Sequence, residues 1–484
     1  MTLKTSSTTC CIIVTLFSTI VLILLLSCEF NLASPSSLIQ TIQNSQKSFS
    51  AHLFQSLSQP PTSSQQPQQQ ISTPSNVVFS PFSIFMVLSM MLVGAQGHTQ
   101  LELAHALTLD YYQRQGSQVF NFNPHGDFAT SMSQLIDHSV NSSELSVANG
   151  IFTEQSFKLS SSYMDTISND FHSQLKSCDF VHHAEPERRS INQWVSNRTK
   201  NLINDLIPIG AITADTKLVL VNAIYFLGKW RIPFDKEDSF TGTFSQLKKS
   251  QDDTSSTLTV ESVNVQYMSR HQVREFFGQN EKYKWLRRQY SSQDFEMLFI
   301  VPKTSISLSE QSEKEFEEWV SHQISLNAFP VTNSSEGSLT VKTLSQAFDT
   351  SSLMLRLVQI PKFKIEYENE LSNVLKQAPF NMTTSFEKLK ANFTNMLSKV
   401  SILREDRLWI DKIFHKAYLK VDEQGTEAAA ATAGIIVGRT TSIDIEPEID
   451  FVLDRPFAFV LSHVPTQSVL FMGKVNHLVS VSSS

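Results

Sequence analysis

The residue types that carry catalysis are present in this 484-residue chain, but their spacing matches no common catalytic motif. There is no G-x-S-x-G turn for a serine nucleophile, no H-E-x-x-H zinc motif, no P-loop and no G-x-G-x-x-G dinucleotide motif. Ser80, His415 and an aspartate have the residue types of a catalytic triad, but nothing in the sequence places them together, so the sequence does not support a triad. His182 and His183 lack a cysteine or acidic partner at metal-ligand spacing, so we interpret them as surface residues. We therefore expect no enzyme activity, no metal and no cofactor.

One stretch near the carboxyl end has an unusual composition. VDEQGTEAAAATAGIIVGRTTS, residues 421–442, is a run of small residues that leads to a single arginine, Arg439. Alanine favours helix, but eight residues are too few for a stable isolated helix, and glycine and β-branched residues follow the run. With the strand period of two, the residues on one face are all small: Thr426, Ala428, Ala430 and Thr432. Such a strand enters a packed sheet without the overpacking cost of large side chains, roughly 1–3 kcal/mol.

Charge and composition narrow the class of protein. Hydrophobic residues make up 41 % of the chain, which is typical of a globular protein. The net charge of −7 argues against a nucleic-acid partner, because such binding needs many cationic contacts to phosphate. A local basic cluster, at Lys282, Lys284, Arg287 and Arg288, is interpreted as a solvated face.

The amino terminus predicts export. Residues 1–33 combine a basic start at Lys4 with a long apolar run over residues 10–28, which is typical of a secretory signal peptide. The run also approaches the length that spans a bilayer, so an uncleaved signal anchor is the alternative. Both place the rest of the chain outside the cytosol, as a secreted extracellular protein or a membrane-anchored surface form.

Export determines whether the cysteines can form disulfides and whether the asparagines can be glycosylated. Cys10, Cys11 and Cys28 lie in the leader and only Cys178 lies in the body, so a core without disulfides must hold the fold. Five asparagines begin Asn-x-Ser/Thr sequons and are candidate glycosylation sites: Asn141, Asn197, Asn333, Asn381 and Asn392.

Residues 36–478 are predicted to form one domain that carries a low-complexity Pro/Gln/Ser insert at 59–75. Apolar spacing predicts a helix over 37–58 and a buried helix over 80–95. Continuous β-rich runs at 216–226 and 294–302 predict strands covered on both faces, and a late strand pair is joined by a hairpin turn. The pattern favours an α+β fold with helices mostly early and strands mostly late.

Several stretches, in order along the chain, resemble the serpin family of protease inhibitors. They are NVVFSPFSIFMVLSMMLVGAQGHTQLELAHAL, LVLVNAIYFLGKWRIPFD, IPKFKIEYENELSNVL, FHKAYLKVDEQGTEAAAATA and DRPFAFVLSHVPTQSVLFMGKV. The resemblance covers nearly everything from about residue 37 to 478. It implies three β-sheets, about nine helices and an exposed reactive-centre loop near the carboxyl end.

The resemblance also implies roles for particular residues. The loop is similar to that of antithrombin-like inhibitory serpins, and counting from Gly425 places the reactive bond at Arg439–Thr440. The implied hinge consists of Gly425, Thr426, Glu427, Ala428, Ala429, Ala430, Ala431 and Thr432. The implied shutter beneath the main sheet consists of Ser80, Ser83, Asn222 and His415. A buried hydrogen-bond network with no switching role is the alternative interpretation of the shutter.

The expected function is inhibition of trypsin-like serine proteases by a suicide-substrate mechanism. The cleaved loop inserts into the main sheet and traps the protease as a covalent complex. A non-inhibitory serpin that acts as a carrier or chaperone is the alternative. Residues 118–147, where a heparin-binding helix would lie, contain no Lys or Arg, so heparin activation through that helix is not expected. Residues 440–456 are somewhat longer than the resemblance implies, so counting backwards gives a different bait. We expect a monomer.

Overall fold

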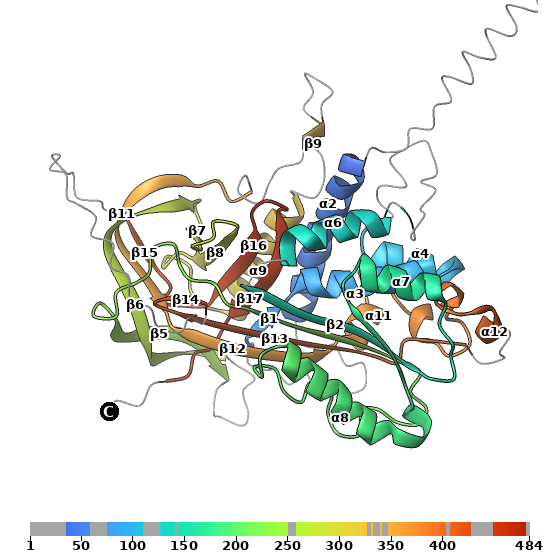
Figure 1. The fold of residues 1–484 in the computed structure, drawn as a ribbon. Helices are drawn as coiled ribbons and strands as arrows, with labels where there is room; N and C mark the ends of the chain where they lie inside the picture. Colours follow the sequence, from blue (N-terminus) through green and yellow to red (C-terminus); the bar gives the residue numbers. More distant parts are fainter. Residues whose placement is uncertain are drawn as a thin grey trace, which may run out of the picture.

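The computed structural model places helices and strands throughout the chain (Figure 1). It describes residues 35–58, 75–109, 126, 128–140, 144–249, 258–326, 331–332, 339–340, 347–402, 407–426 and 449–480. The described residues contain nine α-helices and three sheets, so the expected α+β fold is confirmed. None of the helices in these ranges combines the length and apolarity needed to cross a bilayer.

The helices lie mostly in the first half, as expected. They are α2 (Pro35–Ser58), α3 (Pro81–Gly94), α4 (Gly97–Ala106), α6 (Ala129–Val140), α7 (Ser161–Asn169), α8 (Phe180–Arg198), α9 (Glu310–Leu326), α11 (Ser372–Lys376) and α12 (Lys399–Ile402). Every residue of α3 is buried. Its start is fixed by Ser80, whose Oγ accepts the Ser83 N–H at 3.2 Å, and by Pro81 in the first turn.

The larger sheet has nine strands in the order β1-β17-β16-β8-β7-β6-β11-β15, with β5 paired to β6. The bounds are β1 Val77–Phe79, β5 Phe240–Lys249, β6 Leu258–Gln279, β7 Tyr283–Gln289, β8 Phe295–Pro302, β11 Ser351–Pro361, β15 Asp450–Val452, β16 Phe457–His463 and β17 Ser468–Val475. The predicted late hairpin is the antiparallel pair β16–β17. A separate two-stranded sheet pairs β9 (Val331–Thr332) with β10 (Leu339–Thr340).

The six-stranded sheet runs β12-β13-β4-β2-β3, with β14 paired to β13. The bounds are β2 Leu145–Glu154, β3 Gln174–Cys178, β4 Leu218–Phe226, β12 Phe363–Glu370, β13 Lys412–Asp422 and β14 Gly425–Thr426. At its centre β4 and β13 are parallel neighbours over seven register pairs, from Lys412↔Val219 to Tyr418↔Tyr225. We call the boundary between these two strands the seam. No third strand lies between them within the described ranges.

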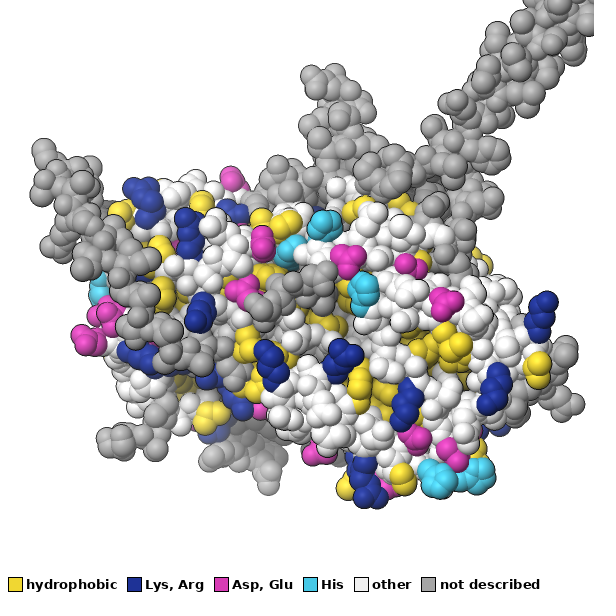
Figure 2. Space-filling view, viewed as in Figure 1, with side chains coloured by type: hydrophobic (Ala, Val, Ile, Leu, Met, Phe, Trp, Pro, Cys, Tyr) yellow, Lys and Arg dark blue, Asp and Glu magenta, His cyan; other side chains and the backbone are white. Residues whose placement is uncertain are grey.

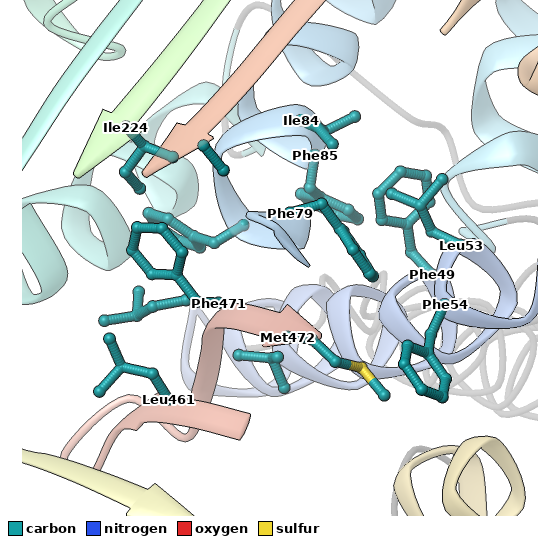
Figure 3. Packing of buried hydrophobic residues seen from close by; sticks show 14 of the residues in the cluster. Phe49, Leu53, Phe54, Phe79, Ile84, Phe85, Ile224, Leu461, Phe471 and Met472 are labelled. Carbon is teal, nitrogen blue, oxygen red and sulfur yellow. The ribbon is translucent and has the colours of Figure 1, made fainter. Parts of the chain in front are cut away.

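The seam is buried because helices cover both faces of β4, as its continuous apolar sequence predicted. On one face lies the main core, where α2, α3 and β17 converge (Figure 3). There Phe49 of α2 meets Phe85 of α3 edge to face at 5.7 Å between ring centroids. On the other face lies a second apolar cluster made by α8 and the segment after it. Its members include Phe180, Ile191, Val195, Val221, Tyr225, Phe414 and Tyr418.

Candidate functional site

The candidate site begins where β13 ends, at the first residues of the predicted hinge. Gly425 and Thr426 are described, whereas the rest of the hinge, Glu427–Thr432, and the predicted reactive bond Arg439–Thr440 lie outside the described residues. The chain turns after Asp422, and β14 pairs antiparallel with the end of β13, with Val421 opposite Thr426.

On its other side β14 meets the segment that follows β4. The Thr426 N–H donates to the Gly228 carbonyl oxygen at 2.7 Å, and Gly425 forms a bridge with Lys229. Gly425 has φ +147°, and a Cβ there would lie 2.0 Å from the Gly228 oxygen, so this position requires glycine. Two residues of the predicted hinge therefore occupy strand positions at one end of the seam.

Thr426 is fully buried in an aromatic pocket. Its Oγ1 shares a hydrogen bond of 2.6 Å with the Tyr290 hydroxyl. The Tyr290 ring stacks on Trp230 with centroids 4.5 Å apart, and the Trp230 indole N–H donates to the Asp422 carbonyl at 3.0 Å. Burial raises the pKa of Tyr290, so its hydroxyl stays protonated. A charged side chain in place of Thr426 would find no counter-ion among these neighbours.

Glu423, two residues before the predicted hinge, stabilises the turn between β13 and β14. Its carboxylate forms an ion pair with Lys362 and accepts the Ser239 hydroxyl at 2.7 Å. Its carbonyl accepts the Phe234 N–H at 2.9 Å. Burial opposes ionisation, but the bonds from Lys362 and Ser239 prevail and hold the pKa of Glu423 below its usual value. Sequence reasoning missed this residue, because its partners lie far away in the sequence.

The structure brings the four predicted shutter residues together, and all four side chains are buried. Asn222 of β4 lies opposite His415 of β13 in the register, and the His415 Nδ1–H donates to the Asn222 Oδ1 at 2.5 Å. The Asn222 amide donates to Ser83 Oγ. The backbone N–H of Ser80 donates to His415 Nε2 at 3.3 Å. A hydrogen-bond network therefore crosses the seam at its middle.

A fifth member of this network, Asn149 of β2, was not predicted. Its Oδ1 accepts the Ser83 hydroxyl at 2.9 Å and the Asn222 amide at 2.6 Å. The signal for it was weak: a single asparagine between short apolar runs of a strand that also contains serine, threonine and glutamate, and it is buried here. Buried polar groups are normally hydrogen-bonded, so such a residue indicates a partner without naming it.

His415 is neutral in this network. Burial lowers its pKa to about 3. Its Nδ1–H donates to the Asn222 carbonyl oxygen while its Nε2 accepts from Ser80, and this pattern requires one ring proton only. One His415 ring nitrogen bonds the Asn222 side chain in place of an aspartate, and the other bonds the backbone N–H of Ser80 in place of its hydroxyl, so these two residues do not form a serine-histidine-aspartate triad.

His182 and His183 are exposed, as predicted, but they do have an acidic partner. Their Nδ1 atoms lie 3.0 and 2.9 Å from the Asp179 carboxylate oxygens. Asp179 also accepts the His182 N–H as the cap of α8, and hydrogen bonds from His183 and His182 lower its pKa to about 2. The spacing of three and four residues is that of a helix cap. In the described part of the chain no group of three or more His, Cys, Asp or Glu residues is arranged for a metal ion.

The remaining predicted residues lie on or near the surface, apart from Cys178. Asn197 and Asn381 are exposed, and Asn392 is half-buried with its Oδ1 accepting the Thr394 hydroxyl at 2.8 Å. Asn141 and Asn333 lie outside the described residues. Cys178 is buried, and burial raises the pKa of its thiol to about 12. The α6 helix, in the region considered for heparin, carries no Lys or Arg.

Proteins of known sequence or structure resemble this chain. A sequence profile described as Serpin (serine protease inhibitor) matches residues 44–478. The leukocyte elastase inhibitor A of Rattus norvegicus is 31% identical over 402 residues, which cover 83% of this chain and 92% of that protein. Serpin B10 of Sorex araneus is 30% identical over 418 residues, covering 82% and 92%. The native stressed conformation of Arabidopsis AtSerpin1 matches with a TM-score of 0.66 at 26% identity, covering 91% of this chain and 98% of that one.

Proposed function

The chain belongs to the serpin family of serine protease inhibitors, and we propose that it is a secreted inhibitor of trypsin-like proteases with its bait bond at Arg439–Thr440. The observation that carries the proposal is the position of Thr426, which lies fully buried in strand pairing at one end of the seam. A strand that continued β14 in the same direction would run along the β4–β13 boundary. The small side chains that follow Thr426 in the sequence suit a strand that must enter a packed sheet.

The proposed reaction begins as ordinary proteolysis. The serine hydroxyl of the protease attacks the carbonyl carbon of Arg439, and the bond to the Thr440 nitrogen breaks as that nitrogen takes up a proton. An acyl-enzyme ester between the serine and Arg439 remains. The Arg439 guanidinium suits a specificity pocket with an acidic base. The cleaved loop then continues β14 down the seam, antiparallel to β4 and β13, and carries the esterified protease with it.

Insertion gains hydrogen bonds because one ladder is exchanged for two. The parallel β4–β13 ladder is lost, and the incoming strand pairs with both of these strands. The net gain is on the order of ten main-chain hydrogen bonds at about 0.5–1.5 kcal/mol each. That is comparable with the stability of a protease domain, about 5–15 kcal/mol, so distortion of the trapped enzyme is energetically feasible. In this proposal the native chain is held in place kinetically.

Secretion and glycosylation form part of the same proposal. They rest on the leader pattern in residues 1–33 and on the exposure of Asn197 and Asn381.

Two alternatives compete with the inhibitory activity proposed here. A non-inhibitory carrier is disfavoured by the small hinge residues. The relatives named leukocyte elastase inhibitor raise the second alternative, a bait at an apolar residue such as Val437.

The test mixes the purified secreted chain with trypsin and resolves the products on a denaturing gel. A covalent complex is expected, together with a released fragment whose first residue, by mass spectrometry, is Thr440. Arg439→Ala should abolish the complex with trypsin and leave the thermal unfolding of the chain unchanged. Cleavage at Arg439 without any complex would identify a substrate and refute inhibition. A complex with Arg439→Ala would place the bait elsewhere.

A further inference from the structure

A pocket of about 860 Å³, open to solvent, lies between α9 and the turn that joins β6 to β7. Three residues from each side carry the argument that follows: Glu315, Glu318 and Trp319 from α9, and Glu281, Lys282 and Tyr283 from the turn. Residues three and four apart lie on one face of a helix, so the three from α9 face the pocket together. A volume of this size suits a small molecule or a single side chain of a partner.

Aromatic rings form one wall of the pocket. The rings of Tyr283 and Trp319 lie 4.3 Å apart between centroids. Trp285 and Phe348 each lie 5.9 Å from Trp319, so the indole is held by neighbouring rings. Trp319 is only half-buried, and its exposed part lines the pocket. The wall is therefore in place before any ligand arrives.

The hydroxyl of Tyr283 has no hydrogen-bond partner among the described residues, although the residue is only 4% exposed. Its backbone is fixed, because its N–H donates to the Asn280 Oδ1 at 2.7 Å. Burial and the nearby Glu315 carboxylate raise the pKa of Tyr283, so the hydroxyl stays protonated. Buried polar groups are normally hydrogen-bonded, so an unpartnered hydroxyl on a pocket wall indicates that its partner enters from the pocket.

The pocket carries more negative than positive charge. The Glu315 carboxylate is already used, since it accepts the Gln311 amide at 3.1 Å and lies 3.3 Å from Lys282 Nζ. Glu281 and Glu318 are exposed, and no Lys or Arg in the described part of the chain lies within ion-pair distance of either. On the face drawn in Figure 2, by contrast, basic and acidic side chains are interspersed. Two carboxylates, one from the turn and one from the helix, thus remain for a cation.

We propose that this pocket binds an alkyl guanidinium group, either an arginine side chain or a small guanidine compound. A guanidinium is planar and weakly hydrated, so it stacks on an indole such as Trp319 while its N–H groups donate to carboxylates. Glu281 and Glu318 supply those acceptors, and the Tyr283 hydroxyl supplies a third. A quaternary ammonium also binds aromatic faces but has no N–H for these acceptors. No residue of the pocket belongs to the hinge, the shutter or the predicted bait, so the inference does not depend on the proposed function.

The test titrates the purified chain with agmatine, a short alkyl guanidine, in about 50 mM salt and follows the ligand signals by NMR. Agmatine should bind at least about fivefold more tightly than tetramethylammonium, because only agmatine donates hydrogen bonds. Glu318→Gln should weaken agmatine binding about five- to tenfold, and Tyr283→Phe about two- to fivefold. Glu310→Gln removes the same charge from the exposed first turn of α9, outside the pocket, and is the matched control.

Both test substitutions keep the aromatic wall, so the thermal unfolding of each variant should match that of the wild-type chain. A blocked tripeptide with a central arginine distinguishes the two sources of the group. Binding of the tripeptide as tight as that of agmatine supports an arginine side chain of a partner, and binding of agmatine alone supports a small guanidine compound. The assignment is overturned if agmatine does not bind, if tetramethylammonium binds equally well, or if Glu310→Gln weakens binding as much as Glu318→Gln.

Discussion

Acidification should destabilise the seam through His415. The folded chain protonates this residue only near pH 3, whereas an unfolded histidine titrates near 6.5. Between these values the unfolded chain holds a proton that the folded chain lacks, so the free energy of unfolding falls as pH falls. At about pH 5 the contribution of this one group is about 2 kcal/mol, and it is negligible above about pH 7.5, where the histidine is neutral in both states.

His415→Gln isolates that contribution from the other groups that titrate in acid. The glutamine amide reproduces both bonds, since its N–H donates to Asn222 and its oxygen accepts from Ser80, but it does not titrate. The measurement is urea unfolding of the wild-type and the variant chain at the two pH values, monitored by tryptophan fluorescence, and the stability is taken from the transition at the lowest urea concentration. The stability difference between wild type and variant should change by about 2 kcal/mol. Parallel pH dependences would refute a neutral, buried His415.

Two further substitutions probe the hinge. Thr426→Arg buries an unpaired charge against Tyr290, so we expect trypsin to cleave the variant at an unchanged rate without forming a covalent complex, as a denaturing gel would show. Unchanged trapping by that variant would contradict insertion along the seam. Tyr290→Phe leaves the Thr426 hydroxyl without a partner and should cost about 1–2 kcal/mol in the urea transition. Adding Thr426→Val should recover part of that loss, and a purely additive double variant would show that the two hydroxyls are not coupled.

Local patterns predicted the elements that are long and strongly periodic. The helix over 37–58 is α2, the buried run after Ser80 is α3, and the two continuous β-rich runs are β4 and β8. Burial and strand or helix period act within a few residues of each other, so one sequence suffices to identify such elements. The early strands β2 and β3 and the helix α9 were not predicted, because their apolar patterns are shorter or broken by polar residues.

Tertiary pairing determined the rest of the site. The parallel partnership of β4 and β13 joins residues about two hundred positions apart, and nothing in either segment specifies the other. The resemblance to the family supplied Asn222 and His415, whereas Asn149, Glu423 and Tyr290 needed the structure. The Asp179 contact to His182 and His183 was missed for a different reason: the spacing was judged against metal ligands and not against a helix cap.

The network at the middle of the seam is divided unevenly between the two strands that separate in the proposed insertion. Helix α3, which begins after Ser80 and includes Ser83, packs on β2 and β4, so both serines lie on the same side of the seam as Asn149 and Asn222. His415 alone among the five lies on β13, and both of its hydrogen bonds cross to the other side. Opening the seam therefore leaves the Ser83–Asn149–Asn222 bonds intact and removes both partners of His415 at once. An incoming strand can offset the free-energy cost of breaking the two hydrogen bonds of one neutral, buried histidine. A protonated His415 becomes hydrated as soon as the two strands separate. For this reason pH acts on the seam through His415.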